Sequence, residues 1–475
     1  MNGEYEIVVG LEVHVELATG TKLFCACRNR FGAEPNTLCC PVCLGMPGAL
    51  PRLNRRAVEL AVRAGIAAHC TVAPVCRMDR KQYFYPDLPK GYQISQDDLP
   101  LCRNGYLEIP SQDGVRRIGI TRIHLEEDAG KLTHGERETL VDCNRCGVPL
   151  IEIVSEPELH SGAEAAAYLR EIRKLMVACG VSDCRMQEGS MRCDVNLSVR
   201  RRGETALGTR TEIKNLNSFA FTEKAIAYEA ARQVKELETT GRVRQCTMRY
   251  DAATGKTEVM RVKETADEYR FLAEPDIPPL ALPEEWVAGI RAGMPELPRE
   301  REDRLCRAYG ITRTDAEELG ALQGLSEWFE AAACATRFPK IAVNLLLTDL
   351  LKFADGEPVS FPVTPERLGE LSDLAGSGRI NRSTAKKLLL RLCAGDFSPV
   401  EIAERENLTQ ITDPAVLEAW VRETVAEDRR SADDYRAGRT NALRALQGRL
   451  MAKSAGRADP VLAARILDQV LKEEH

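Results

Sequence analysis

The segment "GLEVHVEL" near the N-terminus constrains the fold most, because it alternates strictly between apolar and polar residues. In a β-strand successive side chains point to opposite faces, so such a segment has one apolar face and one polar face. The polar face carries Glu12, His14 and Glu16. The pattern therefore predicts a strand with a buried core on one side and an acidic row, with an imidazole in it, on the other.

Three further segments, "RCDVNLSVR", "GTRTEIKNLNSF" and "VPLIEIVSEPEL", also combine apolar and polar strand positions. The last of them places a glutamate inside an apolar run, where it is costly unless a partner such as Mg²⁺ balances its charge. The polar residues of interest in these segments are Arg192, Asp194, Arg210, Glu212 and Glu152. Each face taken singly is typical of the solvated side of an antiparallel sheet. Together they predict a concave polar sheet that holds divalent cations through oxygens and a polyphosphate through the arginines.

The stretch "RIHLEEDAGK" follows another alternating run and leaves two interpretations open, a solvated turn or a metal site. If the strand continues, His124 and Glu126 share one face, and Glu127 lies on the other. ATP chemistry is the natural use of such faces, but the chain has no P-loop: its nearest match, "YDAATGKT", has Tyr250 where the first glycine is required. We expect a turn between strands there.

Seventeen cysteines are present, most of them in the first 200 residues. The N-terminal segment has no signal-peptide pattern, which leads us to expect a cytoplasmic protein and metal ligands instead of disulfides. Cys25 and Cys27, followed by Cys40 and Cys43, predict a structural tetrahedral zinc site, with buried reduced thiols as the alternative. A further C-x-x-C pair in "DCNRC" has no clear mate and is interpreted as incidental.

At 475 residues the chain is too long for a single core. Residues 1–292 show short strands with few helices, which indicates an α+β catalytic domain that includes the cysteine loop. Beyond a Pro-rich stretch, residues 293–400 predict a helical domain, and residues 401–475 predict a small all-α tail domain. No run approaches the roughly 18 apolar residues of a membrane span.

The tail is basic although the whole chain has a net charge of -6. Between Arg429 and Arg457 eight basic residues stand against two acidic ones, a net +6. Such local asymmetry is typical of a surface that follows nucleic-acid phosphates, and an ordinary charged helix surface is the alternative.

Long motifs in a fixed order resemble the B subunit of the bacterial glutamyl/aspartyl-tRNA amidotransferase (the GatB family) over essentially the whole chain. They are "GLEVHVEL", "FGAEPNT", "DRKQYFYPDLPKGYQISQ", "IGITRIHLEEDAGK", "GVPLIEIVSEPE", "EGSMRCDVN" and "EIKNLNSF". The resemblance implies an antiparallel-sheet cradle, similar to glutamine synthetase and guanido kinases, followed by the helical domain and a tail that binds tRNA.

The resemblance also implies an activity and its partners. A protein of this family uses ATP and Mg²⁺ to phosphorylate the side-chain carboxylate of misacylated Glu-tRNA(Gln) or Asp-tRNA(Asn), and ammonia then displaces the phosphate. The amidase GatA supplies ammonia from glutamine, and the small protein GatC completes a heterotrimer. Structural Zn²⁺ in the cysteine loop occurs in some members.

Site residues follow from the resemblance. It places one set of metal ligands at Glu12, His14, Glu127 and Glu152, and a second, nucleotide-associated ion at Asp194 and Glu212. It places Lys81 and Lys90 on the ammonia route that ends near Glu127. We expect Glu127 to face the ion, with Glu126 and Asp128 as supporting groups.

Two other functions compete with this enzyme: a zinc-containing tRNA scaffold whose partner does the chemistry, and a ligase that acts on a free small acid. Converging carboxylates argue against the scaffold, and the basic tail argues against the small-acid ligase.

Overall fold

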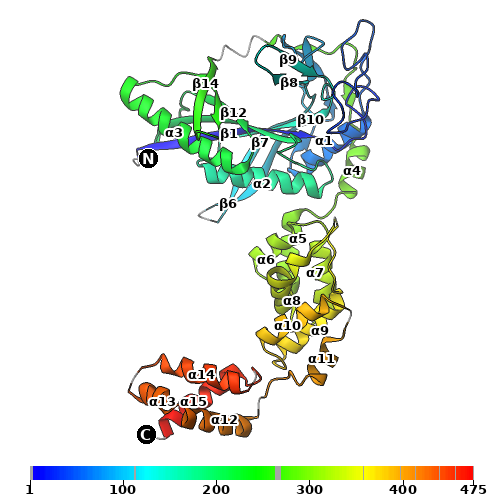
Figure 1. Ribbon diagram of the computed structural model, residues 1–475. Coiled ribbons are helices and arrows are strands. Elements are labelled where there is room, and N and C mark those ends of the chain that lie inside the picture. The colour runs from blue at the N-terminus through cyan, green and yellow to red at the C-terminus, as the bar shows by residue number, and fades with distance from the viewer. Residues whose placement is uncertain are drawn as a thin grey trace. The chain divides into compact units, whose positions relative to one another are not determined.

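The computed structural model describes residues 4–111, 114–262, 269–356, 358–395, 397–411, 413–437, 439–454 and 456–473. The chain divides into two compact units, Met1–Leu297 and Pro298–His475. A large sheet with helices forms the first unit, and helices form the second, in agreement with the expected α+β class (Figure 1). The likeness of the cradle to glutamine synthetase and the domain limits at 292 and 400 stay predictions.

A nine-stranded sheet forms the framework of the first unit, in the order β14-β13-β12-β11-β1-β10-β7-β6-β2. All neighbours in it are antiparallel except β12 and β13, which are parallel. The strands are β1 (Tyr5–Glu16), β2 (Thr71–Val72), β6 (Cys102–Ser111), β7 (Gly114–Glu127), β10 (Pro149–Ser155), β11 (Met191–Arg201), β12 (Thr211–Leu216), β13 (Cys246–Asp251) and β14 (Lys256–Val262).

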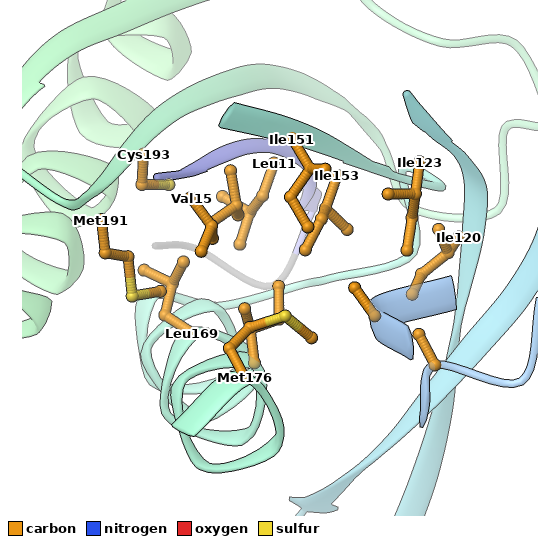
Figure 2. Packing of buried hydrophobic residues seen from close by; sticks show 14 of the residues in the cluster. Leu11, Val15, Ile120, Ile123, Ile151, Ile153, Leu169, Met176, Met191 and Cys193 are labelled. Atoms are coloured by element: carbon orange, nitrogen blue, oxygen red, sulfur yellow. The ribbon is translucent and has the colours of Figure 1, made fainter. Parts of the chain in front are cut away.

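Three helices pack on the apolar face of this sheet: α1 (Arg55–Ala67), α2 (Gly162–Ala178) and α3 (Phe219–Thr240). The alternation in β1 is confirmed, since Leu11 and Val15 are fully buried in the resulting core. Figure 2 shows Leu169 and Met176 of α2 below Leu11 and Ile151 of the sheet. The helices thus cover one face and leave the polar row on the opposite face.

Smaller elements complete the first unit. They are β3 (Val75–Cys76), β4 (Asp79–Gln82), β5 (Tyr92–Ser95), β8 (Lys131–His134), β9 (Thr139–Asp142), β15 (Leu272–Ala273), β16 (Leu280–Ala281) and α4 (Glu284–Ala292). The sheet β15-β4-β5 carries Lys81 on β4, and β5 supplies a backbone contact to Glu127 that is described below. The predicted turn in "YDAATGKT" is confirmed, because it joins β13 to β14.

Helices, with two isolated β-bridges, make up the second unit over the part of it that the structure describes. They are α5 (Pro298–Tyr309), α6 (Arg313–Leu319), α7 (Leu325–Cys334), α8 (Pro339–Leu345), η2 (Leu346–Leu350), η3 (Leu351–Phe353), α9 (Pro365–Gly376), α10 (Arg382–Leu392), α11 (Pro399–Arg405), α12 (Pro414–Glu427), α13 (Arg429–Arg436), α14 (Ala442–Lys453) and α15 (Pro460–Glu473). One apolar cluster lies between Leu305 and Ala403 and another between Leu417 and Leu471. Among the described residues, no helix is both long and apolar enough to cross a membrane.

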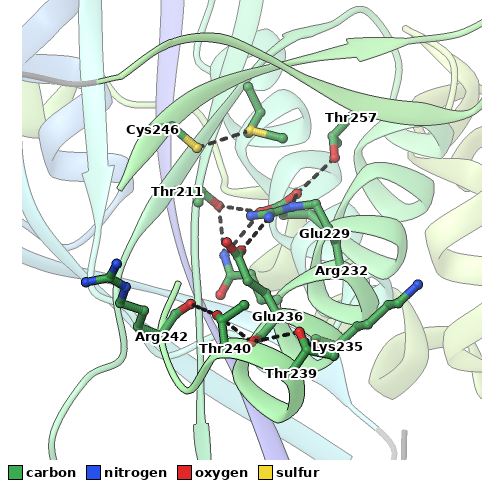
Figure 3. Close-up of polar contacts among 12 residues, drawn as sticks. Thr211, Glu229, Arg232, Lys235, Glu236, Thr239, Thr240, Arg242, Cys246 and Thr257 are labelled. Atoms are coloured by element: carbon green, nitrogen blue, oxygen red, sulfur yellow. Dashed lines mark hydrogen bonds and ion pairs between the residues drawn. The ribbon is translucent and has the colours of Figure 1, made fainter. Parts of the chain in front are cut away.

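A buried carboxylate, Glu229 of α3, ties this helix to the sheet (Figure 3). It accepts hydrogen bonds from the Thr211 hydroxyl on β12 and the Thr257 hydroxyl on β14, both at 2.9 Å. Arg232, one turn further along the helix, donates to the same carboxylate at 2.7 Å. Glu229 therefore fixes the start of β12, the strand that carries Glu212.

We expect Glu229→Ala to lower the free energy of unfolding by about 3 kcal/mol, because it removes the carboxylate that accepts from two buried hydroxyls and is one of the two carboxylates that Arg232 contacts. Urea unfolding measures the loss. Lys235→Ala, an exposed position on the same helix, should change the free energy by no more than about 0.5 kcal/mol. Equal effects of the two substitutions would contradict this account of the network.

Candidate functional site

The polar face of the sheet gathers charged residues through the register of four neighbouring strands. His14 on β1 lies directly opposite Glu152 on β10 and Arg192 on β11. Glu152 in turn lies opposite His124 on β7. Directly opposed residues have Cβ atoms about 4.5–5.5 Å apart, so the register alone makes a continuous row of interacting side chains.

The first cluster on this face consists of His14, Glu126 and Glu152, whose potential ligand atoms lie within 4.8 Å of one another. His14 Nε2 lies 3.3 Å from Glu152 Oε2 and 3.8 Å from Glu126 Oε1. Burial opposes the charge of His14, but its hydrogen bond to Glu152 and the nearby carboxylates raise the pKa of the imidazole to about 9. Although burial acts against ionisation of Glu152, His124 and His14 hold the pKa of this carboxyl below its usual value. The glutamate that the sequence marks as costly thus has two histidines as partners.

Glu127 lies apart from this cluster, and the expectation that it faces an ion stays a prediction. Its carboxylate accepts a hydrogen bond from Lys90 Nζ and another, at 2.9 Å, from the Ile94 backbone N–H. The reason is the alternation of β7: Glu126 shares a face with His124, and Glu127 points to the other side. The structure therefore brings Glu126, and not Glu127, to the polar face beside His14.

The second cluster consists of Glu12, Asp194 and Glu212, again with potential ligand atoms within 4.8 Å. Burial and the neighbouring Glu152 raise the pKa of Glu12. The Lys214 ammonium donates a hydrogen bond to Asp194 and lies 3.0 Å from Glu212 Oε1. A cation already bridges two of these acids, which shows that the cluster suits positive charge.

The remaining residues expected at the site do not all lie on the polar face. Arg192 donates to Asp128 Oδ2 at 2.5 Å and lies on the polar face. Arg210 is exposed and precedes β12, outside both clusters. Lys81 Nζ lies 4.9 Å from the centre of the Tyr269 ring. The structure thus joins Arg192 to the polar row and leaves Arg210 outside it.

The four cysteines of the predicted metal site come together, with all four Sγ atoms within 4.8 Å of one another. Cys43 Sγ lies 3.5 Å from Cys25 Sγ and 3.8 Å from both Cys27 Sγ and Cys40 Sγ. A tetrahedron of Zn–S bonds of about 2.3 Å has S···S edges of about 3.8 Å, so the residues fit zinc. The C-x-x-C pair Cys143 and Cys146, interpreted from sequence as incidental, packs against this group.

A cavity of about 180 Å³ lies beside both the cysteine loop and the Lys90–Glu127 pair. Cys43, Gly45 and Met46 line it on the loop side, and Lys90 and Glu127 line it on the sheet side. Gly45 has φ +60°, and a Cβ added there would lie 2.9 Å from Lys90 Cα. The cysteine loop therefore touches the lysine directly, and only glycine allows that approach.

Comparison with known proteins identifies the family. A family model described as "GatB/GatE catalytic domain" matches residues 7–288, and one described as "GatB domain" matches residues 327–471. The chain is 48% identical over 475 residues to a protein of Caldanaerobacter subterraneus subsp. tengcongensis, covering 99% of each chain. That relative is named as the B subunit of aspartyl/glutamyl-tRNA(Asn/Gln) amidotransferase. The chain belongs to this family.

Other relatives agree over the same length. The proteins of the same name from Carboxydothermus hydrogenoformans and Moorella thermoacetica are each 46% identical, with coverage of 98% of this chain and 98% and 100% of theirs. The first family model spans both carboxylate clusters and the cysteine loop. The polar face therefore lies within the segment that the family description calls catalytic.

We expect Glu126→Gln to weaken Mn²⁺ binding by more than roughly 10-fold, because it removes a carboxylate ligand from the first cluster. Loss of a group that only supports a ligand costs roughly 10-fold or more. Glu127→Gln should leave Mn²⁺ affinity nearly unchanged. Calorimetric titration without nucleotide measures both, and Asp194→Asn separates the second cluster from the first. Weak binding in Glu127→Gln alone would restore the assignment made from sequence.

Proposed function

We propose that this chain activates the side-chain carboxylate of the misacylated residue on Glu-tRNA(Gln), Asp-tRNA(Asn) or both with ATP, and amidates it with ammonia. As a member of the GatB family, the chain is an enzyme of tRNA-dependent amidation, a ligase that forms a carbon–nitrogen bond with glutamine as amido donor. The observation that carries the chemical assignment is the pair of carboxylate clusters on one sheet face. A protein that only binds tRNA does not require two carboxylate clusters on one sheet face.

The reaction has two steps. The substrate carboxylate attacks the γ-phosphorus of ATP, which forms an acyl phosphate and releases ADP; ammonia then attacks the acyl carbon, and phosphate leaves. Both partners of the first step are anions, so positioning and charge neutralisation supply most of the catalysis. Mg²⁺, when bound, neutralises the phosphate and carboxylate oxygens that react.

The chain's own residues divide this work. His14, Glu126 and Glu152 would hold one cation, and Glu12, Asp194 and Glu212 the nucleotide-associated one. Histidine is an unusual ligand for Mg²⁺, which prefers oxygen, so the carboxylates of the first cluster carry most of the attraction. Arg192 lies beside the row and is suited to bind a phosphate or carboxylate oxygen.

Lys90 and Glu127 form the ammonia end of the site in this proposal, with Lys81 on the route. The cavity beside the Lys90–Glu127 pair is lined by charged groups as well as apolar ones. A polar passage suits the exchange between ammonia and ammonium better than an apolar one. Glu127 therefore acts on the amine side, and not as a ligand of the cation.

A zinc ion held by Cys25, Cys27, Cys40 and Cys43 is the second part of the proposal. Four sulfur ligands leave no open position for substrate, so the ion would be structural. Its task would be to fix the loop that forms one wall of the cavity.

The proposed complex is a heterotrimer of this chain with the amidase GatA and the small protein GatC; it binds the tRNA and acts in the cytoplasm. Residues 1–292 would carry the chemistry, residues 293–400 a helical domain, and residues 401–475 the contact with tRNA. The word "subunit" in the relatives' names supports an enzyme of several chains.

ATP hydrolysis by the reconstituted complex, with ammonium supplied directly, tests the assignment. Turnover should require misacylated tRNA, and Glu126→Gln should lower it by about 100-fold or more, because transition-state charge loses its support. Glu223→Gln, an exposed carboxylate on α3, should behave as the wild type. If ATP turnover survives in Glu126→Gln, the chemistry lies outside this sheet face, as the scaffold alternative requires. Turnover that needs no tRNA would instead favour the ligase that acts on a free small acid.

Loss of exposed positive charge from the tail should weaken tRNA binding. Arg430 and Arg444 are both exposed, and alanine at each should reduce the salt dependence of binding by about one unit of slope per lost phosphate contact. Arg422→Ala is the matched control, because Arg422 is already paired with Glu418 at 2.7 Å. The affinity for tRNA, measured over a range of salt concentrations, tests this prediction. An unchanged slope would show that the tRNA binds at another surface of the chain.

A further inference from the structure

Lys22 is a fully buried lysine at the cysteine cluster, with an exposed fraction of 0%. Its Nζ lies 3.5 Å from Cys43 Sγ and 3.3 Å from the carbonyl oxygen of Cys143. Neither the sequence motifs nor the proposed reaction uses this residue.

The charge of Lys22 needs an anion. A buried ammonium is costly without one, and within the described part of the chain no carboxylate lies at ion-pair distance from Nζ. The carbonyl of Cys143 is neutral. Of the two groups that Nζ contacts, the sulfur of Cys43 is the one that can carry negative charge.

A divalent metal on four thiolates supplies that charge, because the assembly carries two net negative charges. We propose that Lys22 is the charge partner of a metal–thiolate centre formed by Cys25, Cys27, Cys40 and Cys43, and that it donates an N–H···S hydrogen bond to Cys43. The inference rests on the metal site proposed above. Lys22 would not bind the metal itself; it would act through the sulfur and stabilise the loaded form.

The backbone fixes Lys22 at the junction between the cysteine loop and the sheet. Its N–H donates to the Cys27 carbonyl at 2.9 Å, within the first cysteine pair. The next residue, Leu23, donates to the carbonyl of Gly147 at 2.8 Å, just before β10. Lys22 thus links the metal loop to the segment 143–147 that leads into the strand of Glu152.

Lys22→Met tests the proposal in the full chain, since methionine fills a similar volume without the charge. Zinc retention against a competing chelator should weaken by about 10–100-fold, the usual cost of losing an outer-shell partner. Lys224→Met, an exposed lysine in the same unit, should retain zinc as the wild type does.

A spectroscopic measurement separates the charge from simple packing. With Co²⁺ in the site, the thiolate-to-metal charge-transfer band of Lys22→Met should move to longer wavelength, because the sulfur loses the hydrogen bond that stabilises its electrons. A side chain that only filled space would leave the band in place.

The outcomes distinguish the two proposals. No zinc in the wild type would overturn the metal site itself. Zinc held equally by wild type and Lys22→Met, with the same Co²⁺ band, would overturn the role of Lys22 and leave the site standing. Should Lys22→Met not fold, Lys22→Gln loses the charge and keeps an N–H donor on a side chain one bond shorter. It should still retain zinc less tightly, and equal retention would contradict the proposal.

Discussion

The antiparallel pairing of β1 with β10 and β11 is the constraint on which the rest of the structure depends. It puts His14 opposite Glu152 and Arg192, and Glu12 opposite Asp194. A slip of one residue would turn every one of these side chains into the core and expose the apolar set. The hydrophobic core under α2 and the charged row above it are therefore two consequences of one register.

Opposite charges are paired at several positions of this face and its surroundings. His14 and His124 contact the glutamates of the first cluster, Lys214 bridges the second, and Lys90 holds Glu127. Lys22 and the cysteine sulfurs repeat the arrangement at the loop. Most of these buried charges are stabilised by a partner of opposite charge. Glu12 differs, because its carboxylate accepts a hydrogen bond from the neutral Asn196 amide at 2.8 Å, and burial and Glu152 raise its pKa.

Much of the fold was predictable from local pattern. The strand in "GLEVHVEL" and the turn in "YDAATGKT" are both where the sequence places them. The site was predictable only in part. Alternation along β7 already put Glu126 beside His124, and the structure has these two side chains 3.5 Å apart. The resemblance placed the metal ligand at Glu127, which stays a prediction. Lys22 carried no signal, since nothing in a lone lysine before a cysteine pair shows that it will be buried.

The sequence by itself determined which residues share a strand face, that the chain is helical beyond about residue 293, and that four cysteines are close enough along the chain to meet. These are short-range properties, decided by side-chain period and spacing. Only the tertiary structure decided which acid meets which base. His14 and Glu152, or Lys22 and Cys143, lie far apart in the sequence, and their distances depend on long-range strand pairing and burial, which no local pattern contains.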